Sequence, residues 1–95
     1  MRIISNRCLR EFAERFPEAN TVLQAWRKAM EKSEFPHWGA LKAAFPSVDK
    51  VGDETVFNIG GNKFRIAANI SFAAQILWIK AVMTHAEYDK GAWKK

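Results

Sequence analysis

The sequence predicts an α+β fold: a small, mainly antiparallel sheet with N-terminal helices packed on one of its faces. The first half of the chain carries apolar residues at the spacing of amphipathic helices. Residues 55–84 instead alternate with a period of two, which is typical of half-buried strands, and short turns between such strands favour antiparallel pairing. A chain of 95 residues with 48% hydrophobic and 26% charged residues suits one globular domain, which we expect over residues 1–95.

The N-terminal segment predicts a short strand followed by a helix. Arg2–Ser5 is β-branched enough to form a strand, and Ser5 or Asn6 is suited to cap the helix that follows. Pro17 ends this helix and suits the first turn of the next one. The apolar face of the first helix consists of Leu9, Phe12, Ala13 and Phe16.

Two more helices and a short strand follow. A second helix is predicted from Glu18 to about Glu34, and Pro36 ends that segment. A third, marked by Trp38, Leu41 and Phe45, stops at Pro46. Val48 and Val51 suggest a strand that leads into a turn at Gly52–Glu54. The residues expected to be buried in the second helix are Val22, Leu23, Trp26, Ala29 and Met30.

Residues 55–84 predict three strands joined by two tight turns. A two-residue turn at Gly60–Gly61 is expected because glycine tolerates positive φ. It pairs Phe57 with Phe64, and Asn58 with Lys63. A second turn near Phe72–Ala73 places Arg65 opposite Lys80.

The two faces of this sheet differ in character. One face, with Phe64, Ile66, Ile79 and Met83, is expected to receive the helices; the other carries Lys63, Arg65 and Lys80, and the exposed ring of Trp78. No acidic residue lies between Glu54 and Glu87. Facing cations destabilise a bare sheet, and a bound anion relieves the repulsion. Arg65 and Lys80 are therefore a candidate phosphate clamp.

The last strand leads into a single helical turn at Ala86–Lys90, which Gly91 ends, and residues 92–95 are expected to fray. His85 and Tyr88 then edge the basic face. Each of these residues also has a purely structural interpretation. His85 is suited to cap the corner, Tyr88 to close the core edge, and the lysines to be solvated. Asn58 and Asn62 flank the glycines and are suited to the turn alone.

Composition narrows the function classes. The net charge of +5 favours an acidic partner, with nucleic acid first and an acidic protein second. A single cysteine, Cys8, and two histidines offer no disulfide framework and no metal-ligand spacing, so we expect no metal and no cofactor. No apolar run approaches the ~20 residues of a spanning helix, and there is no signal-peptide pattern. These features predict a cytoplasmic protein without a membrane partner.

Two blocks of the sequence make the chain recognisable. Residues 56–65, VFNIGGNKFR, and residues 84–90, THAEYDK, resemble the HigB-type toxins of bacterial type II toxin-antitoxin systems. The leading helices and residues 41–46, LKAAFP, are also similar, so the likeness covers nearly the whole chain. The resemblance implies a RelE-like fold and an endoribonuclease (an mRNA interferase) that cuts mRNA, usually on the translating ribosome, and so inhibits translation and growth. It also implies a HigA-like helix-turn-helix antitoxin as partner, and contact with operator DNA only through the antitoxin complex.

The resemblance also suggests site residues. Arg65, His85 and Tyr88 fall in the matching blocks, together with Asn58, Asn62 and Asp89, and Lys80 lies where such toxins often carry a basic residue. We interpret Arg65 and Lys80 as holding the scissile phosphate, and His85 as general base or acid. Tyr88 either orients the nucleophile, stacks on a base, or acts as the base with a lowered pKa. The remaining predicted RNA contacts are Lys63, Asn58, Asn62 and Asn69.

Metal-free RNA cleavage requires a deprotonated 2′-hydroxyl, a neutralised phosphorane and a protonated leaving 5′-oxygen. These side chains can meet all three needs, with a 2′,3′-cyclic phosphate and a 5′-hydroxyl as products. Two alternatives stay open at this point. The same basic face suits a non-catalytic RNA-binding or ribosome-binding module, and it also suits a protein that docks an acidic partner.

Overall fold

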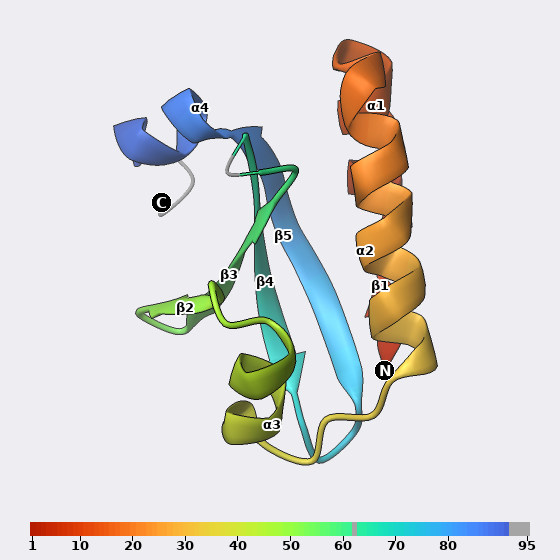
Figure 1. Cartoon of the computed structure of the whole chain (residues 1–95), viewed down its shortest axis with the longest axis vertical. Helices are drawn as coiled ribbons and strands as arrows, with labels where there is room; N and C mark the ends of the chain where they lie inside the picture. Colours follow the sequence, from red (N-terminus) through yellow and green to blue (C-terminus); the bar gives the residue numbers. More distant parts are fainter. Residues whose placement is uncertain (62, 92–95) are drawn as a thin grey trace.

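The structure is a computed structural model that describes residues 1–61 and 63–91 (Figure 1). The predicted α+β architecture is confirmed. The helices are α1 (Asn6–Arg15), α2 (Asn20–Lys32), α3 (Trp38–Ala44) and α4 (His85–Lys90), with a 3-10 turn at Pro17–Ala19. The strands are β1 (Arg2–Ile4), β2 (Asp49–Val51), β3 (Glu54–Ile59), β4 (Phe64–Ser71) and β5 (Ile76–Thr84). The predicted fraying of residues 92–95 lies outside the described residues.

The described strands form one sheet in the order β1-β5-β4-β3-β2. Its pairs are antiparallel except for β1, which runs parallel to β5. The β1 strand covers only the start of β5, because Arg2 pairs with Ile76 and Ile4 with Trp78. The chain then turns away into α1, which runs beside the rest of β5 (Figure 1).

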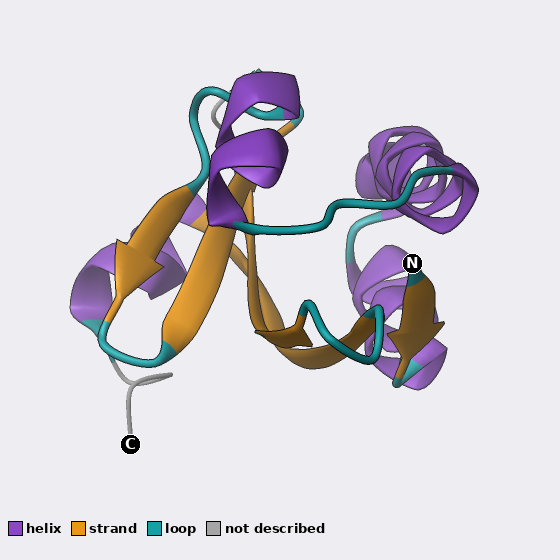
Figure 2. Ribbon diagram, turned by 90° about the horizontal axis from the view of Figure 1, so that it is seen from below, coloured by secondary structure: helices purple, strands orange, loops and turns teal. Residues whose placement is uncertain are grey.

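Helices α1, α2 and α3 cover one face of the sheet, which we call the helix face. Both long helices lie along the same side of the sheet (Figures 1 and 2). Of the described helices, α4 alone borders the opposite, open face, at one end, where Tyr88 packs against Val56, Ala67 and Met83. The main core under the helices includes Leu9, Phe12, Leu23, Trp26, Met30, Leu41, Phe57, Phe64, Ile66, Leu77 and Ile79.

Several details of the helices differ from expectation. Ser5 holds the N-cap position of α1 in the left-handed region (φ 77°), but its side chain makes no capping hydrogen bond. Pro17 begins a 3-10 turn, so α2 starts only at Asn20. Ala29 is exposed, because Leu23, Trp26 and Met30 fill the buried stripe of α2 without it. In α3, by contrast, the predicted boundaries hold, and His37 caps the helix by accepting a 3.2 Å hydrogen bond from the Ala40 amide.

The predicted two-residue turn at Gly60–Gly61 is wrong. Ile59 pairs with Phe64 and Asn58 with Arg65, so residues 60–63 form the connection. It is closed by the Lys63 amide, which donates to the Gly60 carbonyl at 3.3 Å. Gly60 has φ 63°, and a Cβ there would lie 3.0 Å from the Phe64 ring. Backbone conformation and the neighbouring ring thus both require glycine.

Two features overturn the predicted pairing of Arg65 with Lys80: the connection between β4 and β5 is longer than the predicted turn, and β5 contains a β-bulge. Ala67 pairs with Ala81 and Ala68 with Ile79, which leaves Lys80 as the extra residue. An extra residue reverses the alternation of side chains beyond it. Met83 therefore lies opposite Arg65 on the open face, and not under the helices as expected.

The connection between β4 and β5 lies where the second turn was predicted, but it spans residues 72–75. Gln75 adopts φ 55°, and its amide nitrogen donates to the carbonyls of Phe35 and Phe72, both at 2.7 Å. The Phe35 amide returns a 3.1 Å bond to the Gln75 side chain. Gln75 thus ties this hairpin to the loop between α2 and α3. Among the described residues, no helix combines the length and apolar character needed to cross a membrane.

Candidate active site

The corner between β5 and α4 is fixed by a capping box. The Thr84 hydroxyl accepts a 3.2 Å hydrogen bond from the Glu87 amide, and the Glu87 carboxylate accepts a 3.0 Å bond from the Thr84 amide. At the other end Gly91, with φ 72°, ends the helix. Such reciprocal bonds satisfy donors that the first helical turn otherwise leaves open. They hold His85 at the start of α4 and Tyr88 about one turn later.

Glu87 also connects this corner to α1. Its carboxylate lies 3.4 Å from the guanidinium of Arg15, whose charge rests over the Phe16 ring at 5.0 Å. The hydrogen bond from the Thr84 amide lowers the pKa of Glu87 below its ordinary 4.5; burial opposes this shift, and the nearby Arg15 guanidinium adds to it. The short helix is therefore held both by its own cap and by the last turn of α1.

His85 and Asp89 form a side-chain pair on α4. The Nδ1 of His85 lies 2.9 Å from the Asp89 carboxylate, at the i, i+4 spacing of helical neighbours. A proton on Nδ1 that donates to Asp89 leaves Nε2 of a neutral ring as an acceptor. Both side chains are well exposed, 45% for His85 and 60% for Asp89. The pair can thus take a proton from a group that approaches from solvent.

Arg65 and Tyr88 form the buried part of the site. The Arg65 guanidinium carbon lies 5.4 Å from the centre of the Tyr88 ring, and the residue is only 6% exposed. Its Nη1 donates to the Phe64 carbonyl at 3.2 Å. An arginine keeps its charge when it is buried. The phenol ring of α4 therefore covers a permanent cation of β4.

Lys80 does not join this group. Its ammonium lies 2.7 Å from the Glu54 carboxylate, on the far side of β4. The predicted Arg65–Lys80 phosphate clamp is wrong, because Arg65 pairs with Met83, three residues further along β5 than Lys80. The expectation that the basic face lacks carboxylates is also wrong, since Glu54 lies beside Lys80 on the open face.

The other predicted residues divide between the two ends of the open face. The Lys63 carbonyl accepts a 3.0 Å hydrogen bond from the His85 amide, which brings the β3–β4 connection against α4. Asn58 pairs with Arg65 at the same end. Asn69 pairs with Trp78 at the distant end, and Asn62 lies outside the described residues. The structure thus brings together Arg65, Tyr88, His85, Lys63 and Asn58, but not Lys80 or Asn69.

Sequence reasoning assigned no role to three carboxylates. Asp89 is the partner of His85, and their i, i+4 spacing was a readable signal. Glu87 completes the capping box, for which Thr84-His85-Ala86-Glu87 carries the sequence pattern. Glu54 has no comparable signal, because its contact with Lys80 depends on the pairing of β3 with β4 and on the bulge in β5.

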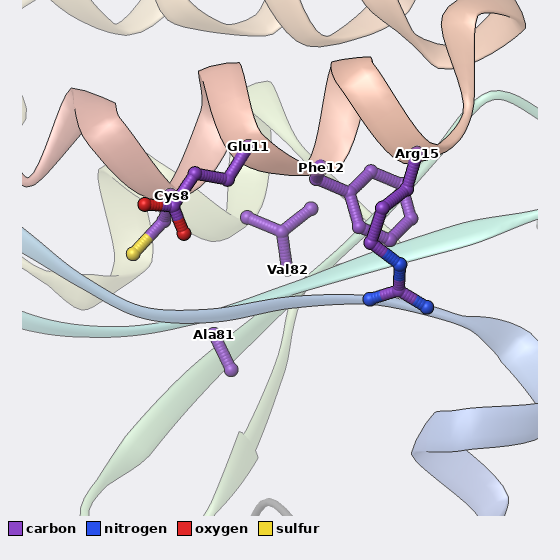
Figure 3. A pocket seen from close by; sticks show the side chains of 6 residues that line it. All are labelled: Cys8, Glu11, Phe12, Arg15, Ala81 and Val82. Carbon is purple, nitrogen blue, oxygen red and sulfur yellow. The ribbon is translucent and has the colours of Figure 1, made fainter.

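A pocket of about 200 Å³ lies between α1 and the edge of β5 (Figure 3). Its lining residues are Cys8, Glu11, Phe12, Arg15, Ala81 and Val82, and none of the predicted site residues is among them. Within residues 1–61 and 63–91, no group of three or more His, Cys, Asp or Glu side chains is placed to hold a metal ion. The candidate site is therefore the corner between β5 and α4, which we call the α4 corner.

Comparison with known proteins gives a consistent result. Residues 19–91 match the family model described as HigB_toxin, RelE-like toxic component of a toxin-antitoxin system. The chain is 39% identical over 92 residues to the mRNA interferase toxin HigB of Escherichia coli strain K12, covering 94% of this chain and 88% of the relative. The same values hold for the mRNA interferase HigB of Shigella flexneri. The mRNA interferase HigB of Escherichia coli O6:H1 is 30% identical over 93 residues, with 95% and 90% of the two chains covered.

Proposed function

The chain belongs to the HigB family, the RelE-like toxic component of toxin-antitoxin systems, and we propose that it cleaves mRNA at the corner formed by β4, β5 and α4. It is the toxin of its system and an mRNA interferase, as its relatives are named. The observation that carries the placement of the site is the His85–Asp89 pair. It lies beside the Arg65–Tyr88 stack at the only end of the described open face that a helix borders.

The proposed reaction is transesterification within the RNA. Nε2 of His85 takes the proton of a 2′-hydroxyl, while Nδ1–H donates to Asp89 and keeps the ring in the right tautomer. The 2′-oxygen forms a bond to phosphorus as the bond to the 5′-oxygen breaks. That oxygen takes a proton from the Tyr88 phenol. Afterwards the protonated His85 releases its proton to solvent and the Tyr88 phenolate takes one up from solvent, so both groups return to their starting states. The products are a 2′,3′-cyclic phosphate and a 5′-hydroxyl, and no step requires a metal ion.

The cationic side chains of the site differ in burial and therefore in role. Arg65, being buried under Tyr88, supplies a fixed positive potential and positions the phenol, in place of the surface grip expected from the sequence. Lys63 is exposed, and its carbonyl accepts a hydrogen bond from the His85 amide, which supports a role for its ammonium in contacting the phosphate. Asn58, the pairing partner of Arg65, is the nearest amide that can contact a base or sugar.

The family also defines the partners. A toxin of this class is neutralised by an antitoxin, which we propose to be a HigA-like helix-turn-helix protein. Operator DNA is then contacted only through the toxin-antitoxin complex. We further propose that cleavage takes place on the translating ribosome, which places the protein in the cytoplasm.

Purified protein added to a translating extract with a defined message tests the proposed function. We expect discrete cuts in the message whose 3′ ends are 2′,3′-cyclic phosphates. Removing ribosomes should abolish or strongly reduce the cuts. Intact message in both conditions, with RNA binding retained, would instead identify a non-catalytic RNA-binding module.

A further inference from the structure

Trp78 leaves a large apolar ring in solvent on the open face. It is 40% exposed, and among the described residues it is the one exposed large hydrophobic side chain. Its neighbours in sequence, Leu77 and Ile79, are buried in the core under the helices, which fixes the direction of Trp78 toward the open face. The ring lies far from α4, since seven residues of β5 at about 3.3 Å each separate it from His85 by roughly 20 Å.

Cations lie on both sides of this ring. Arg2 of β1 pairs with Ile76, so it shares the face of Trp78 two residues earlier along β5, and it is exposed. Lys80 follows two residues later and is 31% exposed at its side chain. Because the Lys80 ammonium lies 2.7 Å from the Glu54 carboxylate, these two charges offset each other, and Arg2 supplies the net positive charge beside the ring. The surroundings of the ring therefore favour an anionic ligand with a flat apolar part.

Asn69 adds a polar group at the same place. It pairs with Trp78 across β4 and β5 and is exposed, and Ala68 and Ile70 on either side pack into the core under the helices. The primary amide can both donate to and accept from the edge of a base. A stacking ring, a primary amide and two flanking cations match the components of a nucleotide: the base face, the base edge and the phosphates.

We propose that Trp78, Asn69, Arg2 and Lys80 form a second RNA subsite, in which Trp78 stacks on an unpaired base several nucleotides from the bond that is cut. This proposal rests on the proposed function and extends its substrate to a longer single-stranded segment. The segment follows the open face from the β1 edge to the α4 corner.

Binding to a non-cleavable RNA tests the subsite independently of catalysis. The probe is a labelled, unstructured RNA of about 15 nucleotides with 2′-O-methyl groups, long enough to reach both ends of the face. Replacing an aromatic ring that stacks on one base costs about 5- to 150-fold in affinity, so we expect a loss in that range for Trp78→Ala. Trp78→Phe should stay within about threefold of the parent because it keeps an aromatic face.

Matched variants show whether the position of a lost positive charge matters, or only its loss. Arg2→Ala should weaken binding several-fold, while Arg10→Ala, an exposed arginine of α1 away from the sheet, should leave binding unchanged. With cleavable RNA, Trp78→Ala should raise KM and leave kcat unaltered, because the ring is remote from His85. A trinucleotide that reaches only the α4 corner should show no difference between Trp78→Ala and the parent.

Three results would overturn the subsite. The first is equal affinity of Trp78→Ala and the parent for the long probe. The second is a loss confined to the complex with the antitoxin, which would assign the ring to a protein partner. The third is equal loss in Trp78→Ala and Arg10→Ala. If the parent protein cleaves no message but Trp78→Ala still loses probe binding, the proposed function fails and the subsite stands.

Discussion

At the scale of single residues, the His85–Asp89 pair carries the proton chemistry. A general base contributes about 10²- to 10⁴-fold to a rate, so we expect His85→Ala to slow message cleavage by that range. Asp89→Asn keeps the shape of the partner but removes the charge that holds Nδ1–H, and a loss of about tenfold is expected. Cleavage of a defined message under single-turnover conditions measures both effects.

Asp53→Asn is the matched control for Asp89→Asn, because Asp53 is exposed in the turn before β3. It should cleave at the parental rate. Full activity of His85→Ala would remove the imidazole from the mechanism and leave Tyr88 as the base.

Tyr88 is expected to have two separable roles, one for its ring and one for its hydroxyl. Tyr88→Phe keeps the ring over Arg65 and its packing on Met83, so stability should fall by less than about 1 kcal/mol while cleavage falls at least about tenfold. Tyr88→Ala also uncovers a buried cation, and it should cost about 2 kcal/mol or more. Urea unfolding and single-turnover cleavage, measured on the same preparations, distinguish the two roles. Parental cleavage by Tyr88→Phe would exclude the phenol as proton donor.

The residues of the α4 corner were named from the sequence, but their arrangement was not. Arg65, His85 and Tyr88 lie in two blocks that resemble a family, and the resemblance identified them. How deeply these side chains are buried depends on how α4 packs on the sheet. The sequence around Arg65 therefore carries no signal that predicts its burial under Tyr88. Lys80 was assigned to the wrong end of the face because the connection after β4 is longer than the predicted turn, and because a bulge is specified by pairing across strands and not by its own residue type.

At the scale of elements, the capping box couples α4 to pH. The pKa of Glu87 is lowered in the folded protein, so its contribution to stability is present above about pH 4.5 and is lost as the pH falls through the folded pKa. Glu87→Gln keeps a capping side chain but removes the charge. We expect the parent to be more stable than Glu87→Gln at pH 7, and the two to converge at acid pH. Unfolding curves between about pH 3 and pH 7 measure this, and a constant gap would contradict the assignment.

The pair formed by Lys80 and Glu54 joins β5 to β3 across β4. The second carboxylate oxygen of Glu54 is buried without a hydrogen-bond partner among the described residues, so Glu54 depends on Lys80 for compensation. Lys80→Met should cost about 1–2 kcal/mol because it leaves a partly buried charge unpaired. Adding Glu54→Gln to Lys80→Met should recover part of that loss. Additive effects in the double-mutant cycle of unfolding free energies would show that the two residues do not interact.

The elements themselves were largely predictable, since periodicity and proline positions located the helices and strands. The features that were not predicted are those that depend on contacts between elements, namely the length of a connection and the register of a strand. The residues between β3 and β4 form a longer connection than two glycines suggest, because Phe64 packs against Gly60. The alternation of β5 changes in mid-strand, and a period of two carries no information about an inserted residue.

At the scale of the whole molecule, the helices take one face of the sheet and leave the other to a ligand. On the proposed path the RNA meets the cations of the open face and the β3–β4 connection, Arg2, Lys63 and Lys80, which are a small part of the 15 lysines and arginines of the chain. Phosphate contacts release counterions from single-stranded RNA with a slope of about −0.7 per contact. With three or four contacts, affinity should fall about 20- to 50-fold between ~50 mM and ~200 mM salt.

Titrating the non-cleavable RNA probe at several salt concentrations measures this slope. Lys63→Ala should make the slope shallower by about 0.7, since it removes one phosphate contact. Lys28→Ala, an exposed lysine of α2 on the far side of the molecule, should leave it unchanged. A slope that is flat in the parent would mean that phosphate contacts do not hold the RNA. A slope that responds equally to both variants would mean that RNA is held by the net charge of the protein and not by its open face. In that case the arrangement of cations around the sheet would serve solubility alone.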